Sequence, residues 1–354
     1  MTETLSAYPP EGSWDHVESL DPAAWPTKVR RSHRLVPTTC FNCEANCGLL
    51  AWVDKATGKI TKFEGNPVHP ASRGRNCAKG PATINQVDDP ERILYPMKRV
   101  GDRGEGLWER ITWDQALVEI GERIGTAFRE DRHHEVMYHV GRMGDDSYME
   151  RVLHSWGIDG HNSHTNICSS GARVGYASWM GFDRPSADFA NAKVIFLISS
   201  HLEAGHYFNP HAQRIIEGQQ NGATVVCVDP RLSNTAAKAD HWLSPWPGTE
   251  AFLLLAIVRL LLVENTWDAK FFERWVNWET FLREARPDLE PTFSNVRQAL
   301  IDQYAEYTPV EAARVCGLEE DQVLEVARVV GGGLGRFASH TWRASSAGNE
   351  GGWM

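Results

Sequence analysis

Several features are missing from this 354-residue sequence, and each absence argues against a class of protein or partner. No apolar run reaches the roughly 18 residues of a transmembrane helix, so we predict no membrane span. The formal net charge is −10, and without a basic excess we expect no nucleic-acid partner. No Gly-x-Gly-x-x-Gly motif occurs, which argues against a plain nicotinamide dehydrogenase. The glycine-rich residues 331–335 lack the Gly-Lys-Ser/Thr of a phosphate loop.

An export signal is missing as well. Arg30-Arg31 resembles a twin-arginine signal, but residues 32–37 behind it contain no apolar segment. We therefore predict a cytoplasmic location. Disulfides are not expected there, because they persist in oxidising compartments.

Cysteines are few, at seven, yet four of them form the most informative pattern. Cys40, Cys43 and Cys47 share one short loop, and Cys77 follows thirty residues later in the tetrapeptide Cys-Ala-Lys-Gly. Thiolates are soft ligands that suit iron–sulfur clusters and zinc. Structural zinc usually takes two short cysteine or histidine pairs, whereas here three thiols share a loop and the fourth stands alone. The spacing favours a cluster, with zinc and a disulfide pair as the alternatives. Lys79 places a cation beside the centre.

The N-terminal quarter of the chain divides into two parts by composition. Residues 1–36 are rich in Pro, Ser and charge and predict an extended arm. Residues 37–98 predict a small cluster-binding domain. Within it, the apolar residues 49–53 and 60–63 predict a hairpin across residues 54–59.

Beyond about residue 108, helical and strand patterns alternate. Thr112 and Gln115 predict a capping box at the start of a helix with one apolar stripe. Residues 194–198 and 224–228 are continuous apolar runs, typical of parallel strands buried on both faces. A helix predicted over residues 210–220 would join them in a right-handed crossover of a doubly wound sheet. Further elements are expected at residues 135–140, 250–264, 267–276 and 336–339.

Separated segments in a fixed order resemble one known family. They are Cys40-x2-Cys43-x3-Cys47, Glu64-Gly-Asn-Pro-Val-His-Pro70, Cys77-Ala-Lys79-Gly80, Ile111-Thr-Trp-Asp-Gln-Ala116, Asn166-Ile-Cys-Ser-Ser170, Val228-Asp-Pro-Arg231 and Trp246-Pro-Gly-Thr-Glu250. Over about residues 37–354 the sequence is similar to the molybdopterin oxidoreductases of the dimethyl sulfoxide reductase family. Members of this family bind molybdenum or tungsten through two pterin guanine dinucleotides.

The resemblance implies an α/β fold. A small N-terminal [4Fe-4S] domain would be followed by doubly wound, Rossmann-like α/β domains. Residues 99–168 together with 331–354 would form the first, incomplete α/β domain, and residues 169–330 the second, nucleotide-binding one. Catalytic subunits of the family are much longer and end in a barrel-like domain that is absent here. We therefore expect the N-terminal half of a catalytic subunit, completed by further polypeptide or by a second chain.

The resemblance also assigns roles to residues. The four cysteines would hold a [4Fe-4S] cluster, and Lys79 would lie between the cluster and one pterin, on the electron path. Cys168 would be the protein ligand to molybdenum or tungsten, with a small buried residue as the alternative. Cys227 and Cys316 are expected to be buried structural cysteines. The expected cofactor-binding residues are Asp229, Arg231, Thr235, Gly248, Thr249, Glu250 and Glu203.

Two of these assignments have physical alternatives. Asp229 and Arg231 suit a guanine or ribose and a phosphate, respectively, with a helix cap by Asp229 and a surface ion pair as the less favoured alternative. Glu250 stands where the family commonly has the shorter Asp, so its contact with a guanine differs in reach.

The implied activity is two-electron redox chemistry of a small-molecule substrate at the metal. Electrons would pass singly through the cluster to a ferredoxin-like iron–sulfur subunit. Formate dehydrogenases of the family place His after the metal ligand, whereas Ser169 follows Cys168 here. This difference makes a formate dehydrogenase less expected. Reduction of polysulfide, thiosulfate or nitrate remains open, and so does a non-redox hydratase. The alternatives from other classes are an electron-transfer or structural subunit with a cluster but no pterin, and a zinc-stabilised α/β binding protein.

Overall fold

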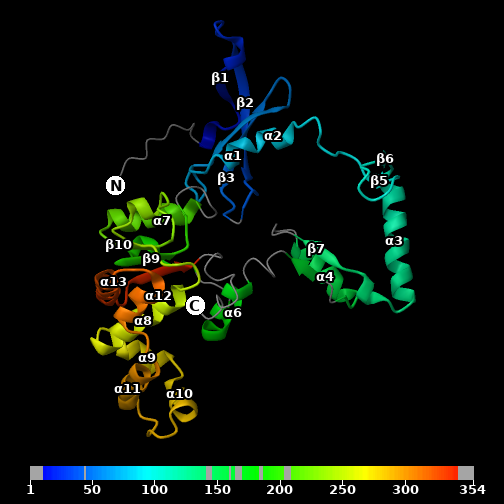
Figure 1. The fold of residues 1–354 in the computed structure, drawn as a ribbon. Helices are drawn as coiled ribbons and strands as arrows, with labels where there is room; N and C mark the ends of the chain where they lie inside the picture. The colour runs from blue at the N-terminus through cyan, green and yellow to red at the C-terminus, as the bar shows by residue number, and fades with distance from the viewer. Residues whose placement is uncertain are drawn as a thin grey trace. The chain divides into compact units, whose positions relative to one another are not determined.

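The computed structural model describes residues 11–43, 45–140, 146–158, 161–163, 170–182, 186–202 and 209–341. Figure 1 labels the helices and strands of this part of the chain. The chain divides into two compact units, residues 1–166 and residues 167–354. Each unit is described by itself below.

The first unit begins with an antiparallel sheet in the order β1-β2-β3-β4. Its strands are β1 (Val17–Leu20), β2 (Arg30–Thr39), β3 (Gly48–Asp54) and β4 (Ile60–Gly65). The predicted hairpin is confirmed, because β3 pairs with β4 and Ala51 lies opposite Phe63. The N-terminal segment differs from an extended arm, since β1 pairs with β2 and β2 pairs with β3. One buried cluster joins the two parts: Trp14, Val17, Leu35, Leu50 and Trp52.

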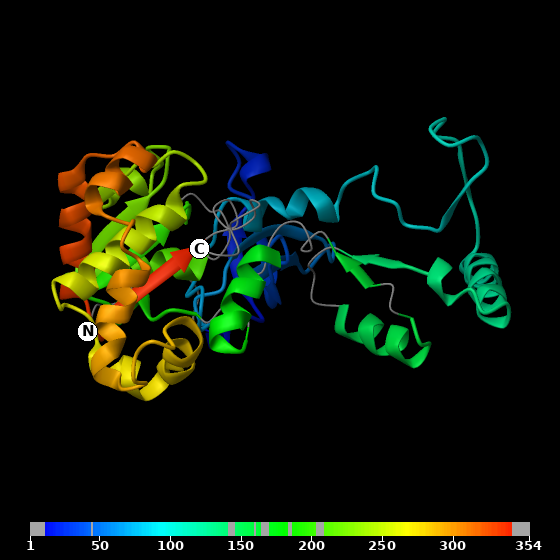
Figure 2. The ribbon, with the colours of Figure 1, turned by 60° about the horizontal axis from the view of Figure 1, so that its bottom comes forward.

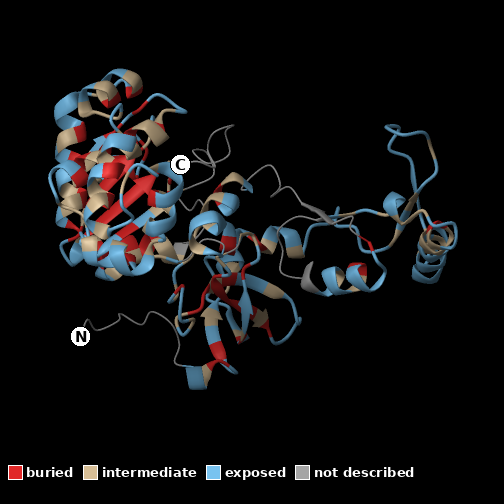
Figure 3. Cartoon of the chain, turned by 90° about the horizontal axis from the view of Figure 1, so that it is seen from below, coloured by how far each residue is buried: buried red, intermediate tan, exposed pale blue. Residues whose placement is uncertain are grey.

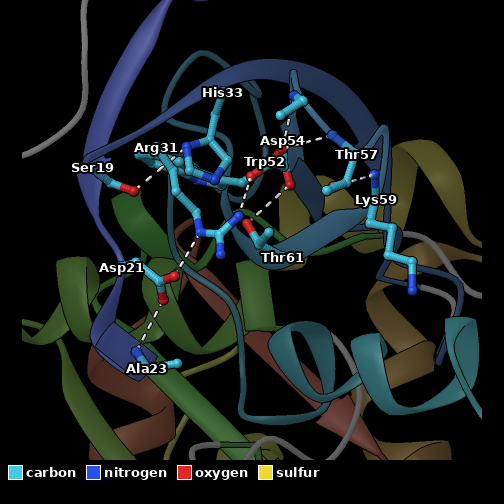
Figure 4. Close-up of polar contacts among 11 residues, drawn as sticks. Ser19, Asp21, Ala23, Arg31, His33, Trp52, Asp54, Thr57, Lys59 and Thr61 are labelled. Atoms are coloured by element: carbon cyan, nitrogen blue, oxygen red, sulfur yellow. Dashed lines mark hydrogen bonds and ion pairs between the residues drawn. The ribbon is translucent and has the colours of Figure 1, made fainter. Parts of the chain in front are cut away.

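Arg31 holds β2 to its neighbours at one end of this sheet (Figure 4). Its guanidinium donates to the carboxylates of Asp21 at 2.7 Å and of Asp54 at 3.1 Å. Asp54 is buried and also accepts hydrogen bonds from the amides of Ala56 and Thr57. The Thr57 amide and the Arg31 guanidinium lower the pKa of Asp54 below its usual range. The ion pairs thus fix the turn between β3 and β4 and the end of β1 onto β2.

The rest of the first unit consists of short elements and one longer helix. They are α1 (Lys79–Ala82), α2 (Ile84–Val87), β5 (Met97–Arg99), β6 (Trp108–Arg110), α3 (Trp113–Arg129), β7 (Tyr138–Val140), α4 (Asp146–Ser155) and β8 (His161–Ser163). Thr112 caps α3 by accepting the Gln115 amide at 3.1 Å, as predicted. The Gln115 side chain instead donates to Glu119, so only half of the predicted capping box forms. Much of α3 is exposed (Figure 3), including Leu117 and Ile120.

A four-stranded parallel sheet in the order β11-β10-β9-β12 forms the centre of the second unit. Its strands are β9 (Val194–Ile198), β10 (Thr224–Val228), β11 (His241–Leu243) and β12 (Phe337–Thr341). The predicted strands and parallel crossover are confirmed. β12 pairs with β9, so residues 337–341 complete this sheet, although residues 331–354 were expected in the first α/β domain. The buried side chain of Ala338 packs with Ile195 and Leu197 in one cluster, which accounts for this pairing.

Helices cover both faces of the parallel sheet (Figures 1 and 2). Phe196 and Ile198 of β9 pack in the cluster formed with α8, α12 and α13, whereas Ile195 and Leu197 pack in the cluster that includes Ile215 of α7. The apolar runs are therefore buried on both faces, as predicted. The helices of this unit are α6 (Ser170–Met180), α7 (Asn209–Gln220), α8 (Glu250–Val263), α9 (Ala269–Trp275), α10 (Trp278–Ala285), α11 (Phe293–Gln303), α12 (Pro309–Cys316) and α13 (Glu320–Gly332).

Cys227 in β10 and Cys316 in α12 are fully buried, as expected for structural cysteines. In the part of the chain that the structure describes, no helix has both the length and the apolar character needed to cross a membrane.

Candidate functional site

Three of the four expected cluster ligands lie in the loop between β2 and β3. The amide of Cys40 donates to the carbonyl of Cys47 at 2.8 Å, which closes the loop at its two ends. Both of these cysteines are buried in the cluster that contains Leu49 and Phe63. Cys43, between them, is half-buried. The loop therefore rests on the apolar face of the sheet at one side and keeps a partly accessible thiol near its middle.

The chain makes an excursion over residues 66–76 before it reaches Cys77. The Gly74 amide donates to the Asn66 carbonyl at 2.8 Å, and the Gly48 amide donates to Ser72 Oγ at 3.1 Å. A Cβ atom on Gly65 would lie 2.1 Å from the carbonyl oxygen of Gly74, so the two backbones touch where no side chain fits. These contacts fold the excursion back onto the ends of β3 and β4. They explain how a cysteine thirty residues further along returns to the loop.

We expect Gly65→Ala to destabilise the first unit and to lower its iron content. The added Cβ meets backbone rather than a movable side chain, so the excursion must shift, at a cost of about 3 kcal/mol in the free energy of unfolding. Denaturant unfolding and iron analysis measure the two effects. Gly121→Ala is the matched control: its Cβ meets nothing within 4 Å inside α3, and alanine there should stabilise the helix by up to about 1 kcal/mol. Wild-type stability and iron in Gly65→Ala would contradict the close approach.

Cys77 and Lys79 lie at the start of α1. The Gly80 amide donates to the Cys77 carbonyl at 3.1 Å. The Lys79 side chain is exposed, and its carbonyl accepts hydrogen bonds from Asn42 at 3.1 Å and from Thr83 at 3.2 Å. Asn42 belongs to the cysteine loop, so this contact joins the loop to the Cys77 segment. The structure thereby brings the four expected cluster ligands and Lys79 into one region of the first unit.

The donor set fits an iron–sulfur cluster. In the described part of the chain, none of the four cysteines forms a disulfide. In a cubane cluster each iron takes one thiolate, so the ligands surround a bulky group instead of converging on a point. Four separate thiols, two of them in apolar surroundings, fit that requirement.

The other expected cofactor residues follow the strands of the parallel sheet. Val228 lies opposite both Ile198 and Leu243, and Ile198 lies opposite Thr341, so the four strands end in register. The segments that follow these strands therefore emerge at the same edge. Ligands of doubly wound sheets bind at this edge.

Asp229 shapes the loop after β10. One of its carboxylate oxygens accepts the Arg231 amide at 2.9 Å, and its carbonyl accepts the indole N–H of Trp242 at 2.7 Å. Asp229 is half-buried and Arg231 is exposed, whereas Thr235 is buried just before a short 3-10 helix. The first two side chains are thus accessible to a ligand at the sheet edge, and Thr235 is placed to support the loop.

Glu250 turns back into its own loop. Its Oε2 accepts the amide of Gly248 at 2.8 Å, and the residue is buried at the first position of α8. Gly248 has a φ of +91°, a conformation that glycine adopts without strain. The Thr249 hydroxyl donates to the Trp246 carbonyl at 2.6 Å. The Glu250 carboxylate thus stabilises the turn that carries Gly248 and Thr249.

Cys168 and Glu203 lie outside the residues that the structure describes. Their expected roles as metal ligand and pterin contact remain predictions from the sequence.

Sequence reasoning missed a polar group beside the sheet edge. The strand order reverses between β9 and β12, which is where ligands enter such folds. There, the buried Ser200 lies 2.9 Å from Nδ1 of His340, and the His340 ring lies 5.7 Å from the ring of His211. Burial lowers the pKa of His211, because desolvation disfavours the charged imidazolium. In the sequence, this group could have been identified from the position of Ser200 directly after a predicted strand.

Comparisons with known proteins agree with this arrangement. A model of the molybdopterin oxidoreductase Fe4S4 domain matches residues 33–89, and a model described as molybdopterin oxidoreductase matches residues 92–334. The chain is 30% identical over 261 residues to the thiosulfate reductase molybdopterin-containing subunit PhsA of Salmonella typhimurium, covering 73% of this chain and 34% of that protein. It is 25% identical over 360 residues to the dimethyl sulfoxide reductase DmsA of Escherichia coli, covering 90% of this chain and 42% of that protein.

A solved structure shares the fold. Acetylene hydratase from Pelobacter acetylenicus superposes with a TM-score of 0.72 at 24% identity, over 86% of this chain and 40% of that chain. The chain thus spans well under half the length of these proteins.

Proposed function

Because the chain belongs to the molybdopterin oxidoreductases, we propose that it forms part of an enzyme for two-electron redox chemistry of a small substrate. The reaction takes place at molybdenum or tungsten held by two pterin guanine dinucleotides. The observation that carries the proposal is the succession of an Fe4S4 domain and a molybdopterin domain in one chain. These two domains imply an iron–sulfur cluster and a molybdenum or tungsten pterin cofactor.

The residues of the first unit would serve the transfer of electrons between a partner subunit and the metal. Cys40, Cys43, Cys47 and Cys77 bind the [4Fe-4S] cluster, which accepts or gives one electron at a time when bound. Lys79 is the fixed cation between this site and a pterin. A positive charge there stabilises added negative charge and so favours electron uptake. Two successive one-electron transfers from a ferredoxin-like iron–sulfur subunit supply each two-electron reduction of the substrate.

The residues of the second unit would bind the nucleotide ends of the pterin cofactors. Arg231 is exposed at the sheet edge and suits a phosphate, and Asp229 suits a guanine or ribose through its second carboxylate oxygen. Gly248, Thr249 and Glu250 form a second turn for the same purpose, with Thr235 behind the first loop and Glu203 beside the pterin. Cys168 is the protein ligand to the metal, because a thiolate suits molybdenum and tungsten.

The substrate class follows from the sequence at the metal ligand and from the relatives. Ser169 in place of His disfavours formate oxidation, and the relatives named above are a thiosulfate reductase and a dimethyl sulfoxide reductase. We therefore propose reduction of a small sulfur compound or oxyanion, in the cytoplasm.

Metal analysis of the purified, complete enzyme tests this function. We expect about four iron atoms per cluster domain, together with one molybdenum or tungsten atom per chain. Iron without molybdenum or tungsten would contradict the enzyme and support an electron-transfer subunit that lacks the pterin. Zinc as the sole metal would contradict both and support a zinc-stabilised binding protein.

A further inference from the structure

Asn42 stands between the first two cluster cysteines, and its side chain is the one polar group from the loop with contacts in three directions among the described hydrogen bonds. Its Nδ2 lies 3.4 Å from Cys40 Sγ, 3.1 Å from the Lys79 carbonyl oxygen and 2.9 Å from Thr83 Oγ1. The side chain is half-buried, and Thr83 is buried. None of these contacts was evident from the motif, in which position 42 is only a spacer.

The partners identify the group that Asn42 presents. The Thr83 hydroxyl donates its own hydrogen to the Lys79 carbonyl, so its oxygen accepts from Asn42. A carbonyl oxygen and a ligand sulfur are also acceptors. The amide N–H2 group, rather than the amide oxygen, therefore faces all three atoms, and its two hydrogens are shared among three acceptors that include the sulfur of Cys40.

We propose that Asn42 is a positioning residue that sets the reduction potential of the iron–sulfur cluster through an N–H···S hydrogen bond to Cys40. This inference rests on the proposed function, because it requires the cluster. Hydrogen bonds to the ligand sulfurs are one of the factors that fix the potential of such clusters. Reduction adds one negative charge, and a donor at the sulfur stabilises that charge, so the potential is higher with Asn42 than without it.

The same side chain couples the sulfur to the electron path. Its bonds to the Lys79 carbonyl and to Thr83 tie the cysteine loop to α1, which begins at Lys79. Gly80 leaves little room for movement there, since a Cβ on it would lie 2.6 Å from Asn76 Nδ2 and 3.4 Å from Leu49 Cδ2. Asn42 thus donates toward Cys40 Sγ while holding the cysteine loop to the backbone of Lys79.

The test is a redox titration of the cluster in the purified full chain, followed by EPR, with iron content measured in parallel. Asn42→Ala removes the donor, and Asn42→Asp keeps the shape but replaces the donor with an acceptor. We expect both variants to retain wild-type iron and to lower the equilibrium constant for electron uptake by about tenfold, a shift of about 59 mV for a one-electron couple. Asn42→Asp should shift further, because its charge opposes reduction.

Thr83→Val is the matched control. It removes the contact at 2.9 Å between Asn42 and Thr83 but leaves the N–H···S contact, so its potential should remain at the wild-type value even if its thermal unfolding temperature falls. A wild-type potential in Asn42→Ala with full iron would overturn the inference. An equal shift in Thr83→Val, or loss of iron from both Asn42 variants, would also overturn it and leave Asn42 a purely structural contact. A wild-type chain without iron would instead contradict the proposed function itself.

Discussion

Cys77→Ala is expected to lose the iron–sulfur cluster, with iron falling from about four atoms per chain to a small residual level. Cys77 is the one expected ligand outside the loop that contains Cys40, Cys43 and Cys47. The whole excursion of residues 66–76 serves to return the chain to this loop, through the Gly74–Asn66 hydrogen bond and the close approach of Gly65. Without the fourth thiolate one iron has no protein ligand, and an incomplete cluster is labile.

The measurement is iron and sulfide content together with the visible absorption of the cluster. Cys227→Ala is the matched control, because this cysteine is fully buried in β10 of the other unit. It removes one thiol from a packed core and should cost stability without changing iron. Full iron in Cys77→Ala would exclude Cys77 as a ligand. Loss of iron in both variants would show that the iron content falls because the protein unfolds, and not because Cys77 no longer binds iron.

The sequence allowed the prediction of those elements whose signal is local. β9 and β10 are uninterrupted apolar runs, and a run of that length is buried on both faces wherever it pairs. The helix after Thr112 has its cap and its periodicity within a few residues. The spacing of the four cysteines is also local, apart from the return of Cys77.

The elements that the sequence did not predict depend on distant partners. β12 contains only one buried apolar residue, Ala338, so its pairing with β9 is not visible in its own pattern. Residues 17–20 are likewise a weak strand, and they become part of the sheet because Val17 packs against Leu50 and Trp52. Strand propensity reflects such packing more than any intrinsic preference of the backbone.

The candidate site shows the same division between local and distant information. Residue types suited to a cluster, a phosphate and a guanine were evident in the sequence at Cys40, Arg231 and Asp229. The contacts that adjust those groups were not, because they join positions far apart: Asn42 with Thr83, and Ser200 with His340. Glu250 illustrates a third case, in which a carboxylate expected to meet a ligand accepts a hydrogen bond from its own turn.

Cys168→Ala is expected to abolish turnover of the complete enzyme while leaving the iron–sulfur cluster intact. If Cys168 is the protein ligand to molybdenum or tungsten, alanine removes a bond to the metal itself. Mutating a residue that only hydrogen-bonds to a metal ligand already costs about 10–100-fold in metal affinity or activity. Removing the ligand itself should therefore lower turnover by more than about a hundredfold. Cluster EPR should be unchanged, because the four cluster ligands lie at residues 40–77.

The assay follows oxidation of a reduced dye with thiosulfate, dimethyl sulfoxide or nitrate as the electron acceptor, with iron and molybdenum or tungsten measured on the same samples. Ser169→Ala is the neighbouring control, since it changes the adjacent residue without removing the thiolate. It should retain both metals and most of the activity. Wild-type turnover in Cys168→Ala would refute the ligand. Equal loss of activity in Ser169→Ala would assign the effect to this segment of the chain instead of to the thiolate, because only Cys168 carries a sulfur that can bind the metal.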